Sequence, residues 1–180
     1  SMVDDEVLVV LPYSQNGSQG NEIRLALSCW RKYCKSKYHF VVIGDFDESI
    51  KEQFDWVEFI YEPRADKKEG QYNPHIDIQH KMEIAYNLFG KKYPGFIWMV
   101  DDNYAINPFY TYEIKNLHYH EPGFVGRKDE PTYYWKHDKW KTRQLLDKEI
   151  LPHINYTTHF PCYFEFKRFL TIKKSVKLLE

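Results

Sequence analysis

The stretch that decides the fold is Phe96-Ile97-Trp98-Met99-Val100-Asp101-Asp102-Asn103-Tyr104, in which five apolar residues run directly into two carboxylates and an amide. The apolar run is too short for a helix, and its uniform hydrophobicity indicates a strand buried on both faces of an α/β sheet. Because open α/β sheets bind ligands beyond the carboxyl ends of their strands, we predict a site for a divalent cation at Asp101 and Asp102. The same Asp-Asp-Asn sequence is also typical of a plain turn.

The rest of the chain alternates strand patterns with helix patterns. Apolar runs predict strands over residues 6–11, 38–43 and 56–61, the last of them at a sheet edge, and apolar residues at helical spacing predict helices over 22–34 and 76–89. We expect the first strand to stop at Pro12, whereas residues 163–171 fit either a strand or a helix. The alternation predicts a single α/β domain over residues 1–180, with a mixed, mainly parallel sheet flanked by helices.

The cysteines and the hydropathy bear on the compartment. The three cysteines, Cys29, Cys34 and Cys162, are odd in number and lack metal-site spacing, so we expect reduced thiols in a cytoplasmic protein. No apolar run approaches the length of a membrane span, and we expect no signal peptide. Residues 175–180 end inside a helical pattern without a stop signal, which is typical of a chain that continues.

The net charge of -1 hides an asymmetry between two parts of the sequence. Residues 1–126 carry 13 basic and 19 acidic side chains, whereas residues 127–180 carry 12 basic and 7 acidic ones. A basic C-terminal segment suits a phosphorylated ligand, although a surplus of this size is also common on a solvated surface. The loop over residues 16–20 has neither a P-loop ending nor a dinucleotide fingerprint, which disfavours kinases and dehydrogenases.

The order of these parts resembles the GT-A fold, the Rossmann-like fold of glycosyltransferases that use nucleotide sugars. The resemblance covers about residues 6–170 and is carried by Leu11-Pro12-Tyr13-Ser14, by Gly44-Asp45, by the helix with Asp77 and Lys81, and by the stretch quoted above. It implies a nucleotide-binding half over residues 1–103 and an acceptor- and diphosphate-binding half over 104–180. In this family a short acidic DXD motif binds a manganese or magnesium ion, which bridges the diphosphate of a donor such as a UDP-sugar.

The resemblance also implies roles for individual residues. The implied metal ligands are Asp101, Asp102, Asn103 and His159, with Asn103 standing where a third carboxylate is common. The implied donor-binding residues are Pro12, Tyr13, Ser14, Asp45, Arg64, Asp77, Lys81, Lys141 and Arg143. An inverting enzyme needs a base that deprotonates the acceptor, and the candidates for it are Asp102, His159 and Glu165, whereas a retaining enzyme is able to work without one. Each also has an ordinary structural interpretation: Asp45 as a turn residue, for example, or Asp77 and Lys81 as an exposed ion pair.

The predicted function is therefore metal-dependent transfer of a sugar from a nucleotide sugar to a hydroxyl acceptor, which is a glycan, a protein or a hydroxylated nucleic-acid base. The main chemical task is to stabilise the departing diphosphate, and a cation with basic side chains supplies charge where it develops. One alternative is a non-catalytic module of the same fold that binds a nucleotide or a glycan. A weaker alternative is a metal-dependent phosphoesterase or nucleotidyltransferase that uses the same Asp pair.

Overall fold

A computed structural model describes residues 5–18, 21–65, 74–116, 121–122, 154–155 and 160–168. The chain divides into two compact units, one formed by residues 1–117 with 159–173 and the other by 118–158 with 174–180. In the second unit the structure describes an antiparallel strand pair, β5 (Glu121–Pro122) with β6 (Ile154–Asn155). The central sheet and the candidate site belong to the first unit, and the following description concerns that unit alone.

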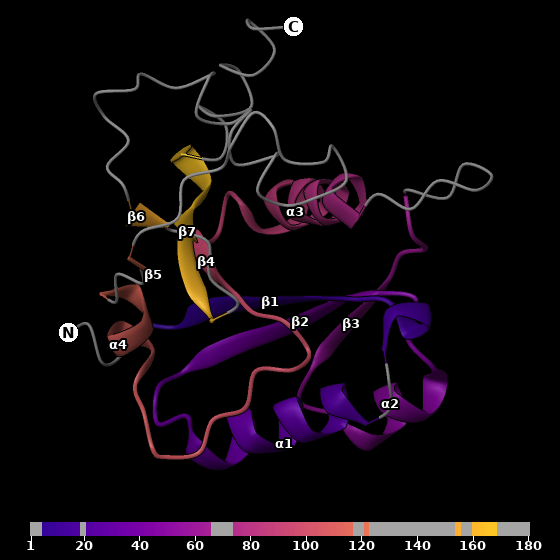
Figure 1. The fold of residues 1–180 in the computed structure, drawn as a ribbon, viewed down its shortest axis with the longest axis horizontal. Helices are drawn as coiled ribbons and strands as arrows, with labels where there is room; N and C mark the ends of the chain where they lie inside the picture. Colours follow the sequence, from indigo (N-terminus) through magenta and orange to yellow (C-terminus); the bar gives the residue numbers. More distant parts are fainter. Residues whose placement is uncertain are drawn as a thin grey trace, which may run out of the picture. The chain divides into compact units, whose positions relative to one another are not determined.

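A five-stranded sheet with the order β3-β2-β1-β4-β7 forms the centre of the first unit (Figure 1). Its strands are β1 (Val7–Tyr13), β2 (Tyr38–Gly44), β3 (Glu58–Tyr61), β4 (Gly95–Trp98) and β7 (Cys162–Glu165). The first four run parallel, and β7 lies antiparallel to β4. This mixed, mostly parallel sheet confirms the predicted α/β class, confirms β3 as an edge strand, and is compatible with a Rossmann-like fold.

Helices cover both faces of this sheet. Figure 1 shows α1 (Glu22–Tyr33) and α2 (Glu48–Gln53) on one side and α3 (Pro74–Phe89) on the other. Alternate residues of β1 divide between the two faces, since Val9 belongs to the core with α1 and Val10 to the core with α3. The short helix α4 (Thr111–Lys115) adds Ile114 to the α1 core. None of the described helices has both the length and the hydrophobicity to cross a membrane.

The structure corrects one predicted strand end, adds a helix that was not predicted, and decides one ambiguous stretch. β1 does not stop at Pro12 but continues to Tyr13. Pro12 has no N–H to donate, and this is tolerated because β4 pairs only with Val9 and Val10, so no strand beside Pro12 on that side needs the hydrogen bond. Helix α2 was missed because Ile50 is its single buried residue, so it shows no apolar period. The ambiguous stretch from residue 163 onward is a strand followed by helical residues 166–168.

Gly44, the last residue of β2, lies against the backbone of β1. A Cβ at this position would stand 1.9 Å from the carbonyl oxygen of Tyr13, its register partner in the central strand. Because the clash involves backbone that cannot rotate away, we expect Gly44→Ala to lower the free energy of unfolding by about 1–3 kcal/mol. Urea denaturation measures this loss, and Glu52→Ala, at an exposed position on α2, should change stability by less than about 0.5 kcal/mol. An equally stable Gly44→Ala protein would contradict the packing described.

Candidate functional site

The candidate site lies where the chain changes direction within the sheet. From β1 the chain builds β2 and β3 on one side, then crosses over through α3 to place β4 on the other side of β1. In open α/β sheets such a switch point, beyond the carboxyl ends of the two diverging strands, is where ligands bind. Here Tyr13 is the last residue of β1 and Ser14 follows it directly, and Asp101 and Asp102 come after the end of β4.

Asp101 and Asp102 lie in a turn that Asn103 closes. The Asn103 Oδ1 accepts the backbone N–H of Val100 at 3.1 Å, and the Asn103 N–H donates to the Val100 carbonyl at 3.2 Å. The turn interpretation is therefore correct for the backbone, and the amide oxygen predicted to bind metal already has a partner. Asp101 is half-buried and Asp102 is exposed. Burial, and then the charge of Asp102, raise the pKa of Asp101.

Several carboxylates lie near Tyr13 at this edge of the sheet and affect the pKa of its hydroxyl. The side chain is buried, and burial is the main reason that the pKa of Tyr13 is raised. A hydrogen bond with Ser18 lowers the pKa, and three neighbouring carboxylates raise it; they belong to Asp101, Asp45 and Glu22. Residues from three different segments therefore share one negatively charged environment, and two of them, Asp45 and Asp101, are predicted site residues.

Two further predicted residues flank the end of β1. The Asp45 Oδ1 accepts the backbone N–H of Gln15 at 2.7 Å, which ties the loop after β1 to the end of β2. The Ser14 Oγ is buried and has no hydrogen-bond partner within the described part of the chain. Because buried hydroxyls usually have a partner, Ser14 is a candidate for contact with a ligand or a water molecule. Pro12 is half-buried one residue before Tyr13 in β1.

Asp77 and Lys81 form a buried ion pair, so the interpretation as an exposed surface pair was wrong. Asp77 is 6% exposed and Lys81 is 1% exposed. The Lys81 Nζ donates to the Asp77 Oδ2 at 2.6 Å and to the Tyr13 carbonyl at 3.0 Å, while the Asp77 Oδ1 accepts the Ala65 N–H at 3.0 Å. The pair thus joins α3 to the end of β1 and to the segment after β3. Its groups are occupied by protein partners, so its direct role is to hold Tyr13 in place.

The structure does not bring Glu165 to this edge. Because β7 is antiparallel to β4, Glu165 pairs with Gly95 at the amino end of β4, whereas Cys162 pairs with Trp98 near the Asp pair. Strand direction is not encoded in the local apolar pattern of residues 163–171, so the sequence does not show at which end of the strand Glu165 lies. Arg64 is half-buried in the segment after β3. The remaining predicted residues, Lys141, Arg143 and His159, lie outside the described residues.

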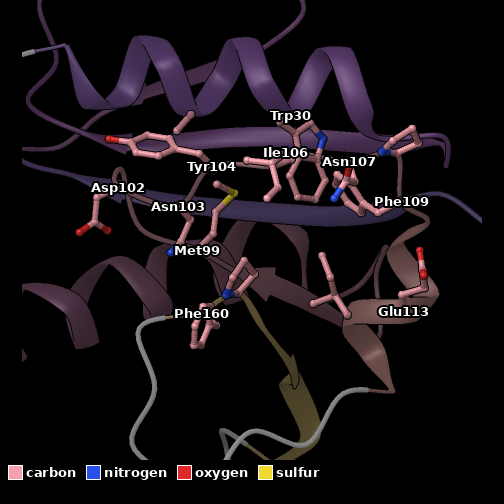
Figure 2. Close-up of a pocket in the computed structure, with 15 residues that line it drawn as sticks. Trp30, Met99, Asp102, Asn103, Tyr104, Ile106, Asn107, Phe109, Glu113 and Phe160 are labelled. Carbon is pink, nitrogen blue, oxygen red and sulfur yellow. The ribbon is translucent and has the colours of Figure 1, made fainter.

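A pocket of about 550 Å³ opens beside Asp102 (Figure 2). Its walls come from α1, from the segment that follows β4, from α4 and from the residues before β7, including Trp30, Ile106, Glu113 and Phe160. This pocket was not predicted from the sequence, because no single segment contains it. The available signal was the cluster of apolar residues directly after the Asp pair.

Of the four carboxylates at this edge, Asp101 and Asp102 are the candidates for holding a metal ion, because Asp45 already accepts the Gln15 N–H and Glu22 accepts the Ser18 hydroxyl. Within the ranges that the structure describes, no group of three or more His, Cys, Asp or Glu side chains is arranged to hold a metal. Mg²⁺ in phosphate-binding sites is commonly held by one or two carboxylates, with substrate phosphates and water as the other ligands. Asp101 and Asp102 fit that kind of site, and a third protein ligand is not required for it.

Comparisons of the chain with protein-family models, with curated proteins and with solved structures gave no match. What can be said of the class of this protein therefore comes from its fold and its candidate site. The first unit is a mixed α/β structure with a mostly parallel sheet, and an acidic site lies at the switch point between β1 and β4.

Proposed function

We propose that this chain is a GT-A-type glycosyltransferase, which transfers a sugar from a nucleotide diphosphate donor, most simply a UDP-sugar, to a hydroxyl acceptor. The observation that carries the proposal is the position of Asp101 and Asp102 beside Tyr13 and Ser14 at the switch point of the sheet. Open α/β sheets bind nucleotides at this point, and paired carboxylates hold Mg²⁺ or Mn²⁺ against phosphate oxygens.

The charge at this edge makes a cation part of the proposal. A diphosphate would meet the carboxylates of Asp101, Asp102, Asp45 and Glu22, and like charges at short range repel. Lys81 does not offset them for a ligand, since it is already bonded to Asp77 and Tyr13. Asp101 and Asp102 would hold the ion, which supplies positive charge to the departing diphosphate.

The transfer itself exchanges one bond at the sugar for another. The bond between the sugar C1 and the diphosphate oxygen breaks, and its electron pair leaves with the nucleoside diphosphate. A bond forms between C1 and the acceptor oxygen, and the acceptor proton passes to a base. Of the candidates for that base, Asp102 is exposed at the correct edge, and Glu165 lies at the opposite edge.

A thermal-shift panel of nucleotides and nucleotide sugars, with manganese or with a chelator, tests the proposal. A donor at 100 times its Kd should stabilise the folded state by about 2.7 kcal/mol and raise Tm accordingly. We expect a UDP-sugar to give this shift with manganese and to lose it with the chelator. NAD, which the sequence disfavours, serves as the negative control. The absence of a shift with every nucleotide sugar would overturn the proposal.

A specific observation also favours the non-catalytic alternative. The Asp pair lies in a turn that the Asn103 side chain closes by accepting the Val100 N–H, which is the arrangement of a plain turn at the end of a strand. A module of this kind would bind a nucleotide or a glycan in the presence of chelator, and calorimetry would detect that binding without release of nucleoside diphosphate. Chromatography of the products separates the transferase from a phosphoesterase or nucleotidyltransferase, because only the transferase releases free nucleoside diphosphate and a glycosylated acceptor.

The thiols favour a reducing compartment. Cys29, Cys34 and Cys162 are all free thiols, with no disulfide between them. We therefore propose that the enzyme acts in the cytoplasm, where free thiols persist.

A further inference from the structure

The pocket beside Asp102 has a buried apolar floor. Ala26 and Trp30 contribute to it from α1, Ile114 from α4, and Met99 from the segment directly after β4. The Trp30 ring packs edge to face against Phe109, with ring centroids 5.0 Å apart. A volume of about 550 Å³ lies within the range of sites for small molecules, roughly 300–1,000 Å³. The space is thus large enough for a bicyclic ring system.

Exposed apolar side chains surround the opening of the same pocket. Tyr104 is 40% exposed, Ile106 is 76% exposed and Phe160 is 62% exposed. Figure 2 shows these three side chains around the space beside Met99. Large apolar residues grouped at one place on a surface mark a binding site, because water solvates them poorly. The rim therefore favours a ligand with a flat apolar body.

The charged groups of the pocket indicate which charge a ligand is able to carry there. Figure 2 shows the side chains of Asp102 and Glu113 at opposite ends of the space. The Glu113 carboxylate accepts the backbone N–H of Tyr110 at 2.6 Å, so it already has a partner. Among the described residues that line the pocket, none is Lys, Arg or His. An anionic ligand would be repelled at both ends, whereas a neutral hydroxyl is able to donate to Asp102.

We propose that this pocket receives the acceptor, and that the acceptor is an uncharged alcohol whose apolar, ring-containing body fills the pocket while its hydroxyl points at Asp102. The inference rests on the proposed glycosyl transfer. Asp102 lines the pocket and also belongs to the acidic motif after β4, so the pocket adjoins the proposed donor site. An acceptor bound in this way presents its oxygen at the edge of the sheet where the donor binds.

Binding of 2-naphthalenemethanol, measured by calorimetry without donor and with a chelator present so that no cation cancels the Asp102 charge, tests the pocket separately from catalysis. We expect this neutral alcohol to bind and 2-naphthoate, its anionic counterpart of similar size, to bind at least about tenfold more weakly because of the two carboxylates. Ile106→Asp should weaken binding of the alcohol about tenfold by removing apolar contact at the rim. Leu88→Asp is the matched control, since Leu88 is 57% exposed on α3 and does not line the pocket.

The outcomes test the assignment of the pocket and the proposed glycosyl transfer separately. Equal binding of the alcohol and the carboxylate, no binding of the alcohol, or equal effects of Ile106→Asp and Leu88→Asp would overturn the assignment of the pocket. Binding that follows the expected pattern, in a protein that no nucleotide sugar stabilises, would keep the pocket and reject the glycosyltransferase. When both hold, Ile106→Asp should raise the KM for the alcohol about tenfold and leave the KM for the donor unchanged.

Discussion

Lys81→Met is expected to lower the free energy of unfolding by roughly 3–5 kcal/mol, the cost of removing one partner from a buried ion pair. The Lys81 side chain is 1% exposed and bonds both the Asp77 carboxylate and the Tyr13 carbonyl. Methionine fills a similar volume but donates no hydrogen bond. The substitution therefore leaves the buried Asp77 carboxylate without its positive partner, with a hydrogen bond from the Ala65 N–H, and the Tyr13 carbonyl loses a donor at the end of β1. Urea denaturation at neutral pH, followed by circular dichroism, measures the loss.

A double-mutant cycle with Asp77→Asn separates the stranded charge from the lost packing. The double variant has no buried charge at this place, so it should be less destabilised than the sum of the two single variants. Lys91→Met, at an exposed position after α3, is the matched control and should change stability by less than about 0.5 kcal/mol. A loss below about 1 kcal/mol for Lys81→Met would show that the pair is solvated in solution.

The elements that sequence analysis predicted well are those whose local pattern reflects their burial. β1 and β2 are buried on both faces and therefore appear as continuous apolar runs, which only an interior strand tolerates. In α1 the apolar residues recur on one side, and that stripe, Ile23, Ala26, Leu27 and Trp30, is the buried one. In these segments the local sequence pattern alone therefore shows which residues are buried.

The features that could not be predicted depend on contacts between distant segments. The apolar residues of α3 are spread around the helix, so its sequence does not reveal that Asp77 and Lys81 face the end of β1. The direction of β7 likewise depends on the path of the chain before it, and that direction moves Glu165 to the far edge. The position of Asp101 and Asp102 at a strand end was predictable because a buried apolar run stops beside them, whereas the pocket next to them is formed by four segments together.

Asp102→Ala is expected to reduce glycosyl transfer by about 10²–10⁴-fold, the usual contribution of a general base, with a further loss of metal-dependent donor binding. Asp102 is exposed, so the free energy of unfolding should change by less than about 0.5 kcal/mol. The measurement is release of nucleoside diphosphate from the donor identified in the thermal-shift panel, with manganese present and with 2-naphthalenemethanol as acceptor. The same variant should lower the pKa of Asp101, because it removes the like charge that helps to raise it.

Asp55→Ala is the matched control for this variant, since Asp55 is also an exposed carboxylate but lies in the turn between α2 and β3. It should retain full transfer, which separates the effect of position from a general loss of surface charge. If Asp102→Ala turns over donor at the normal rate with manganese, neither the metal role nor the base role of Asp102 survives. If donor binding is kept with chelator present and transfer is absent in both proteins, the site is a nucleotide-binding module in which the Asp pair only terminates β4.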